Sequence, residues 1–182
     1  MGAVAAGLML LLWASAASAA NAATCEAYVS EAAAKAQWIR ALGCGYNPDD
    51  PRWTTDRNVH ARWCKAQPPT EVAQEAAHRR GLIKLCQICR AYATLAVAAA
   101  SDNMKLNCGM SGPRWSTGAD AHFGWCMKQR APTDEKATDA VESYRTIAAN
   151  LKKSLILETG ARTQAVGVCK LTRTRTGHPP QR

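Results

Sequence analysis

The chain has 182 residues, a formal net charge of +9, eight cysteines and a single phenylalanine. Eight cysteines are typical of an exported chain in which bridges supplement a thin core. The charge excess lies after Glu158, where five basic and no acidic residues follow. The rest of the chain is only mildly basic, and we expect no specific nucleic-acid partner. Contact of the basic tail with anionic lipid, polysaccharide or nucleic acid is the alternative to a merely solvated tail.

Residues 1–22 are predicted to form a signal peptide. An apolar centre from Leu8 to Trp13 is followed by small residues, the order found in secretory leaders. Cleavage after Ala19 and cleavage after Ala22 both fit this pattern. An uncleaved anchor is the alternative, but the apolar run is shorter than the roughly 20 residues of a spanning helix. We therefore expect a periplasmic or secreted protein with no transmembrane span after cleavage.

The remainder of the chain contains one pattern twice, in residues 23–88 and 89–169. Aligning Cys25 with Cys89 makes Cys-x-Ala-Tyr, Cys-Gly, Pro-Arg-Trp, His and Trp-Cys recur in the same order. This self-similarity predicts an internal duplication. In each copy a helix, a long loop and a second helix are expected, so the fold class is all-α, with four main helices in two tandem disulfide-stapled hairpins.

The predicted helices follow from apolar periodicity and start signals. In the first helix, apolar side chains recur at helical spacing on one face, and the third helix repeats this face from Cys89. Threonines before acidic residues mark the starts of the second helix (Glu71 to Cys86) and of the fourth (Asp134 to about Glu158). Residues 170–182 are expected to be a basic disordered tail. The predicted buried face of the first helix comprises Cys25, Tyr28, Ala32, Ala36 and Ile39.

The expected bridges come from the geometry of an antiparallel helix pair. Residues at the open ends of a hairpin lie side by side, and residues at the two ends of its loop can clasp that loop. The predicted pairs are Cys25–Cys86, Cys44–Cys64, Cys89–Cys169 and Cys108–Cys126. Pairing of Cys86 with Cys89 is the open alternative for the pairs that meet at the junction of the two copies.

The duplicated loops hold the candidate ligand-binding residues. Arginine provides a donor fork for carboxylate, sulfate or phosphate, and an exposed tryptophan provides a stacking face, as expected of a saccharide or anionic-polymer site. The structural alternative is that the histidines hydrogen-bond loop carbonyls and that Trp63 and Trp125 pack beside disulfides. The candidates are Arg52, Trp53, His60, Arg114, Trp115 and His122.

Catalytic and metal sites are not predicted. The Cys86-x-x-Cys89 spacing is explained by the meeting of the two copies, and no second ligand pair completes a zinc site. We expect no catalytic residue, no metal and no cofactor. The leading function is an exported, non-catalytic binding or structural module. The alternatives are a subunit or inhibitor that docks on another exported protein and, less favoured, a hydrolase that uses the loop histidines.

The pattern Cys-x-Ala-Tyr, Cys-Gly, Pro-Arg-Trp-Ser/Thr and His-x-x-Trp-Cys resembles cysteine-rich repeats of uncharacterised secreted proteins of proteobacteria. The resemblance covers residues 25 to 158. It implies a bacterial, periplasmic or extracellular setting, and it implies nothing about substrate. The second copy departs from the pattern because no cysteine stands near Ala149 or Asn150.

Overall fold

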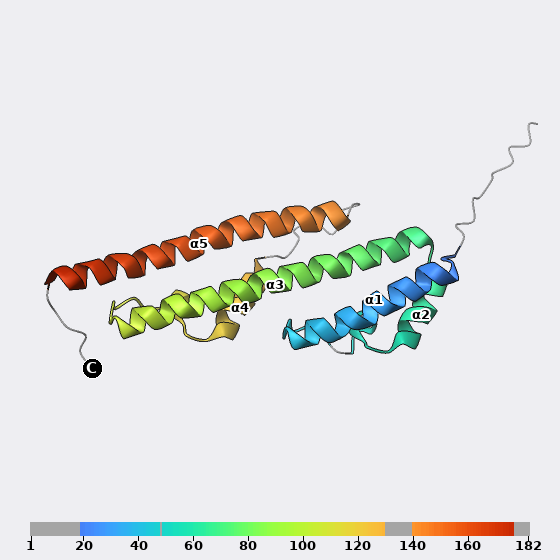
Figure 1. The fold of residues 1–182 in the computed structure, drawn as a ribbon, viewed down its shortest axis with the longest axis horizontal. Helices are drawn as coiled ribbons and strands as arrows, with labels where there is room; N and C mark the ends of the chain where they lie inside the picture. Colours follow the sequence, from blue (N-terminus) through green and yellow to red (C-terminus); the bar gives the residue numbers. More distant parts are fainter. Residues whose placement is uncertain (1–18, 48, 130–139, 177–182) are drawn as a thin grey trace, which may run out of the picture.

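The computed structural model describes residues 19–47, 49–129 and 140–176, and the side chains of 146–175 within the last range. The described residues are all-α, without a strand. Figure 1 shows the long helices lying roughly side by side. The α-helices are α1 (Ala22–Ala41), α2 (Arg57–Lys65), α3 (Pro69–Lys105), α4 (Ala119–Lys128) and α5 (Ala140–Thr176), and the short 3₁₀ helices are η1 (Pro51–Trp53) and η2 (Pro113–Trp115).

Helix α1 forms as the sequence predicts. The side chain of Asn21 accepts a hydrogen bond from the backbone N–H of Thr24 at 2.8 Å and so caps the helix start. All five residues of the predicted face are buried. The helix ends before Gly43, whose φ of 62° suits a residue without a Cβ.

The hairpin arrangement differs from the prediction, because the expected loops are not simple turns. The segment after α1 contains η1 and then α2, and Cys64 in α2 is bonded to Cys25 near the start of α1. The chain has therefore returned to the start of α1 before α3 begins. Consequently α1 and the first half of α3 run in the same direction, as Figure 1 shows. The second loop behaves in the same way, with α4 returning to Cys89.

The expected boundary between residues 88 and 89 lies inside a single helix. Helix α3 is 37 residues long, and its two halves belong to the two expected units. Among the described helices it is the one long and apolar enough to cross a membrane. It is also the central helix, packed against α1, α4 and α5, and 44% of its most apolar stretch is buried inside the fold.

Helix α5 extends beyond its predicted end. The helix was expected to stop near Glu158 before Gly160, yet it continues to Thr176. The disordered tail predicted for 170–182 is therefore wrong over 170–176, and 177–182 lie outside the described residues. Contacts with the rest of the fold explain the extension, since Arg162, Cys169 and Arg173 all bond to preceding elements. These contacts outweigh the weak helix propensity of glycine.

All four predicted disulfide pairings are wrong, as is the alternative Cys86–Cys89. The prediction assumed antiparallel hairpins. Instead, α2 and α4 bring Cys64 and Cys126, the cysteines of the two Trp-Cys pairs, back to Cys25 and Cys89. Cys86 then bonds to Cys44 after the end of α1, and Cys169 bonds to Cys108 after the end of α3. The observed pairs are Cys25–Cys64, Cys44–Cys86, Cys89–Cys126 and Cys108–Cys169.

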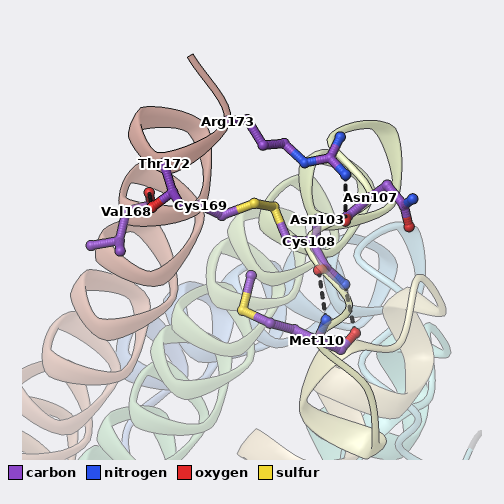
Figure 2. Close-up of a disulfide and its surroundings, with 8 residues drawn as sticks. All are labelled: Asn103, Asn107, Cys108, Met110, Val168, Cys169, Thr172 and Arg173. Atoms are coloured by element: carbon purple, nitrogen blue, oxygen red, sulfur yellow. Dashed lines mark hydrogen bonds between the residues drawn. A yellow bond between two sulfur atoms is a disulfide. The ribbon is translucent and has the colours of Figure 1, made fainter. Parts of the chain in front are cut away.

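Figure 2 shows how the last bridge anchors α5 to the end of α3. Beside it, Arg173 donates a hydrogen bond to the carbonyl of Asn107, which has a positive φ of 49°. Arg90 donates in the same way to the carbonyl of Gly43. Arg90 stands four residues after Cys86, and Arg173 stands four residues after Cys169. An arginine at an equivalent position therefore donates to a carbonyl just after the end of the preceding long helix in both cases.

Two apolar clusters make up the core. The smaller one joins the start of α1 to α2 and to Val72 of α3. The larger one extends along α3 and includes Leu151 and Leu155 of α5. Buried alanines such as Ala36 and Ala96 let the helices approach closely. The loops with η1 and η2 lie against these clusters and carry the candidate site residues.

Candidate functional site: two matching pockets

Two cavities with corresponding linings lie beside the loops. The first pocket has a volume of about 300 Å³ and is bounded by α1, η1, α2 and α3. The second pocket has about 290 Å³ and is bounded by α3, η2, α4 and α5. The first is lined by Tyr28, Asp50, Pro51, Arg52, Val59, His60, Trp63, Glu75 and Arg79. The described residues that line the second are Tyr92, Pro113, Arg114, Ala121, His122, Trp125, Glu158 and Arg162.

A buried arginine lies in the wall of the first pocket. Arg79 is 2% exposed, and its Nη2 donates a hydrogen bond to the Tyr28 hydroxyl at 3.2 Å. Its Nε lies 3.0 Å from Oε1 of Glu75 in an ion pair, although the geometry is too bent for a hydrogen bond. Its Nη1 donates to the carbonyl of Arg52. The buried charge thus has partners on three elements, α1, η1 and α3.

The second pocket repeats these contacts with Arg162. This side chain is also 2% exposed and donates to the Tyr92 hydroxyl at 2.9 Å and to Glu158 at 2.9 Å. Its Nη1 donates to the carbonyl of Arg114. Cation–π contacts add to both networks, with guanidinium to ring-centroid distances of 5.7 Å to each tyrosine.

The rim of each pocket carries one of the predicted arginines. The Nε of Arg52 lies 2.8 Å from Glu75, and the Nε of Arg114 lies 2.8 Å from Glu158. One carboxylate therefore bridges a buried and a rim guanidinium in each pocket. The rim side chains are 40% and 46% exposed. Glu75 engages Arg52 through Nε, and among the described residues no hydrogen bond is made by the terminal nitrogens of this guanidinium.

The two predicted histidines are buried in the pocket walls. Nε2 of His60 lies 2.9 Å from the carbonyl of Thr54, and Nε2 of His122 lies 2.7 Å from the carbonyl of Ser116. These contacts match the structural alternative, in which the histidines satisfy loop carbonyls. Burial lowers the pKa of His60, and the Thr54 hydrogen bond opposes that effect more weakly.

The tryptophans that line the pockets are not the ones that were predicted. Trp53 was expected to present a face to solvent, but it is 2% exposed and stacks on Tyr46 with ring centroids 4.8 Å apart. Trp115 is half-buried and does not line the second pocket. The pocket-lining rings are instead Trp63, which is half-buried, and Trp125, which is 44% exposed. They follow the histidines by three residues and so reach the pocket one helical turn later.

Each pocket tyrosine holds its ring against the pocket tryptophan. The centroids of Tyr28 and Trp63 are 5.1 Å apart, and those of Tyr92 and Trp125 are 5.4 Å apart. Burial raises the pKa of both tyrosines, while the adjacent Arg79 and Arg162 act in the opposite direction. The hydroxyls are therefore protonated at neutral pH.

Sequence reasoning missed the acidic and buried basic residues of the pockets. Glu75 precedes Arg79 by four residues and Cys86 by eleven, and Glu158 precedes Arg162 and Cys169 by the same intervals. This Glu-x3-Arg-x6-Cys pattern was the available signal. It was obscured because Glu75 follows its Trp-Cys cysteine by 11 residues, whereas Glu158 follows Cys126 by 32.

Among the residues with described positions, no group of three or more histidine, cysteine, aspartate or glutamate side chains could hold a metal ion. The described linings of both pockets contain guanidinium, carboxylate, phenol, imidazole and indole groups. These groups form hydrogen bonds and stack on flat rings, which suits recognition of a small polar ligand.

Compared with known proteins, the chain matches no family model, no curated protein and no solved structure.

Proposed function

We propose that this protein is an exported, non-catalytic binding module that recognises a saccharide, either free or as part of an anionic cell-envelope polymer, through its two pockets. The observation that supports this proposal most directly is that each pocket combines a partly exposed tryptophan with a rim arginine held by a carboxylate. A sugar ring stacks its C–H face on an indole and hydrogen-bonds to paired donors and acceptors.

The pocket dimensions support a small ligand. Cavities near 300 Å³ are at the lower end of the range of small-molecule sites, which suits a single sugar residue. The ion pair between Arg52 and Glu75 restricts the rim side chain before binding, and Arg114 and Glu158 do the same in the second pocket. Such preorganisation reduces the entropy that binding would otherwise cost.

The contacts of the histidines support a binding role over a catalytic one. A general base needs a nitrogen within hydrogen-bond reach of its substrate. The Nε2 atoms of His60 and His122 are both engaged with backbone carbonyls, and His60 is 2% exposed.

A screen of neutral and acidic oligosaccharides against the oxidised protein tests the proposal, with calorimetry as the readout. Trp63→Ala and Trp125→Ala should each reduce the measured stoichiometry by one site, because each removes one stacking face. Trp38→Ala is the matched control, since Trp38 is 48% exposed on α1 and lines neither pocket. Absence of binding throughout the screen, or equal binding by all three variants, would contradict the proposal.

Export of the chain is supported by its four disulfides, which persist in oxidising compartments. We favour cleavage after Ala19 over cleavage after Ala22. The backbone N–H of Ala20 donates to the carbonyl of Gln67 at 2.9 Å, and Asn21 caps α1. Cleavage after Ala22 would remove both contacts. N-terminal sequencing of the exported protein should begin at Ala20, and a start at Ala23 would contradict this choice.

A second candidate function is a subunit role, in which the exposed face of α5 docks against a second copy of this chain. Leu157, Val168 and Leu171 are 67%, 58% and 61% exposed and lie within about 60° of one another around α5. Val168 stands directly before Cys169, and Leu85 occupies the equivalent position directly before Cys86. Leu85 is 1% exposed, whereas Val168 is 58% exposed. Sedimentation of the wild type and of Leu157→Asp/Val168→Asp tests whether a second copy covers this face. A concentration-dependent dimer lost in the variant is expected, and a wild-type monomer at high concentration would contradict self-association.

A further inference from the structure

The two pockets differ at one charged position. Asp50 lines the first pocket and precedes Pro51, Arg52 and Trp53. The equivalent position before the second Pro-Arg-Trp is Gly112, which has no side chain. The other charged lining residues correspond pair by pair, since each pocket has a rim arginine, a buried arginine and the glutamate between them.

This difference changes the charge balance of the described linings. In the first pocket two arginines face two carboxylates, those of Glu75 and Asp50. Among the described lining residues of the second pocket, two arginines face one carboxylate, that of Glu158. Counting the arginine, aspartate and glutamate side chains of the described linings, the first pocket is neutral and the second carries one positive charge.

The backbone conformation of each loop suits the residue found there, Asp50 in the first loop and Gly112 in the second. In the first loop Oδ1 of Asp50 accepts a hydrogen bond from the backbone N–H of Arg52 at 2.9 Å and caps η1. In the second loop Gly112 has a φ of 89°, and η2 has no side-chain cap. An L-residue is strained at that φ, so the second loop cannot take an aspartate in the same position without a conformational change.

We infer that the pockets are selective for ligand charge, and that the second pocket takes an acidic sugar such as a hexuronate while the first takes a neutral sugar. This inference rests on the proposed saccharide-binding function. A ligand carboxylate beside Arg114 forms charge-assisted hydrogen bonds, and the described lining holds no carboxylate besides that of Glu158. In the first pocket Asp50 repels the same group, which raises the dissociation constant by about tenfold at the separations within one such cavity.

The experiment follows each pocket separately through the indole N–H resonances of Trp63 and Trp125, assigned with Trp→Phe variants of the oxidised protein. The two probes are a hexuronate trisaccharide and a neutral hexose trisaccharide of the same linkage. In the wild type we expect the hexuronate to shift the Trp125 signal at about tenfold lower concentration than the Trp63 signal. The neutral trisaccharide should shift the Trp63 signal at the same concentration or lower.

Two charge variants test the cause. Asp50→Asn keeps the oxygen that caps η1 but removes the charge, and should tighten hexuronate binding at Trp63 by about tenfold. Ala121→Asp places a carboxylate in the lining of the second pocket and should weaken hexuronate binding at Trp125 by a similar factor. Ala121→Asn is the matched control and should leave that binding near the wild-type value.

The outcomes separate this inference from the proposed function. Equal hexuronate affinity at the two indoles, or no effect of Asp50→Asn and Ala121→Asp, would overturn the charge selectivity while saccharide binding itself stands. If neither trisaccharide shifts either indole signal, the proposed function fails, and the charge selectivity fails with it.

Discussion

Nη2 of Arg79 donates a hydrogen bond to the hydroxyl of Tyr28, 51 residues earlier in the chain, at 3.2 Å. The matching bond from Arg162 to Tyr92 spans 70 residues and measures 2.9 Å. In both units the later long helix therefore sends a buried charge across the pocket to the earlier one. The shape of each pocket depends on keeping that charge paired.

Removing the buried guanidinium should destabilise the protein strongly. In Arg79→Met we expect the free energy of unfolding to fall by about 3 kcal/mol, because the Tyr28 hydroxyl and the carbonyl of Arg52 lose their donor. Urea denaturation with the disulfides intact measures this. The control is Arg57→Met, whose exposed ion pair with Glu26 should contribute no more than about 0.5 kcal/mol. A fall below about 1 kcal/mol for Arg79→Met would contradict the assigned role.

The stability of the protein should depend on pH through His60. Burial lowers the pKa of His60 below the usual 6.5. Below about pH 6.5 the imidazole is therefore protonated in the unfolded chain but still largely neutral in the folded chain. The contribution of His60 is therefore complete above pH 6.5 and is lost as the pH falls toward the folded-state pKa. The stability advantage of the wild type over His60→Gln should shrink between about pH 7.5 and 5. An advantage that is constant or grows on acidification would refute this prediction.

Two glycine substitutions should act in opposite directions. A Cβ at Gly43, where φ is 62°, would lie 2.8 Å from Nη2 of Arg90, so Gly43→Ala should lower the free energy of unfolding by about 1–2 kcal/mol. Gly160 lies inside α5, with open space where the methyl group of an alanine would lie. Gly160→Ala should therefore raise the free energy of unfolding by about 0.5–1 kcal/mol. Thermal unfolding of both variants measures the difference, and the same sign of effect in both would contradict the described backbone.

Tryptic digestion without reduction should reveal the disulfide pairs directly. Cys86 and Cys89 fall in one peptide, LCQICR, which the structure links to both the Cys44 peptide and the Cys126 peptide. A three-peptide species is therefore expected by mass spectrometry. The peptide WCK should be linked to the Cys25 peptide, because Cys64 pairs with Cys25. Free LCQICR, or WCK linked to the Cys44 peptide, would show a different connectivity.

Much of the local structure could be predicted from the sequence because its causes are local. Helical periodicity and the alanine spacing predicted the all-α class and the buried face of α1, whose members Tyr28 and Ile39 are 5% and 2% exposed. The loop histidines were correctly considered as partners of backbone carbonyls, since an irregular segment must satisfy its own polar groups.

The sequence by itself determined the helical class, the buried face of α1 and the residue types available to a site, because short-range spacing decides these properties. Only the tertiary structure decided the disulfide partners and the pocket linings. Helices α2 and α4 reverse the chain within each loop, so the long helices run parallel and Cys64 meets Cys25 instead of Cys44. The same reversal brings Glu75 and Arg79 beside Tyr28. Such long-range contacts depend on the direction of packing, which no local pattern encodes.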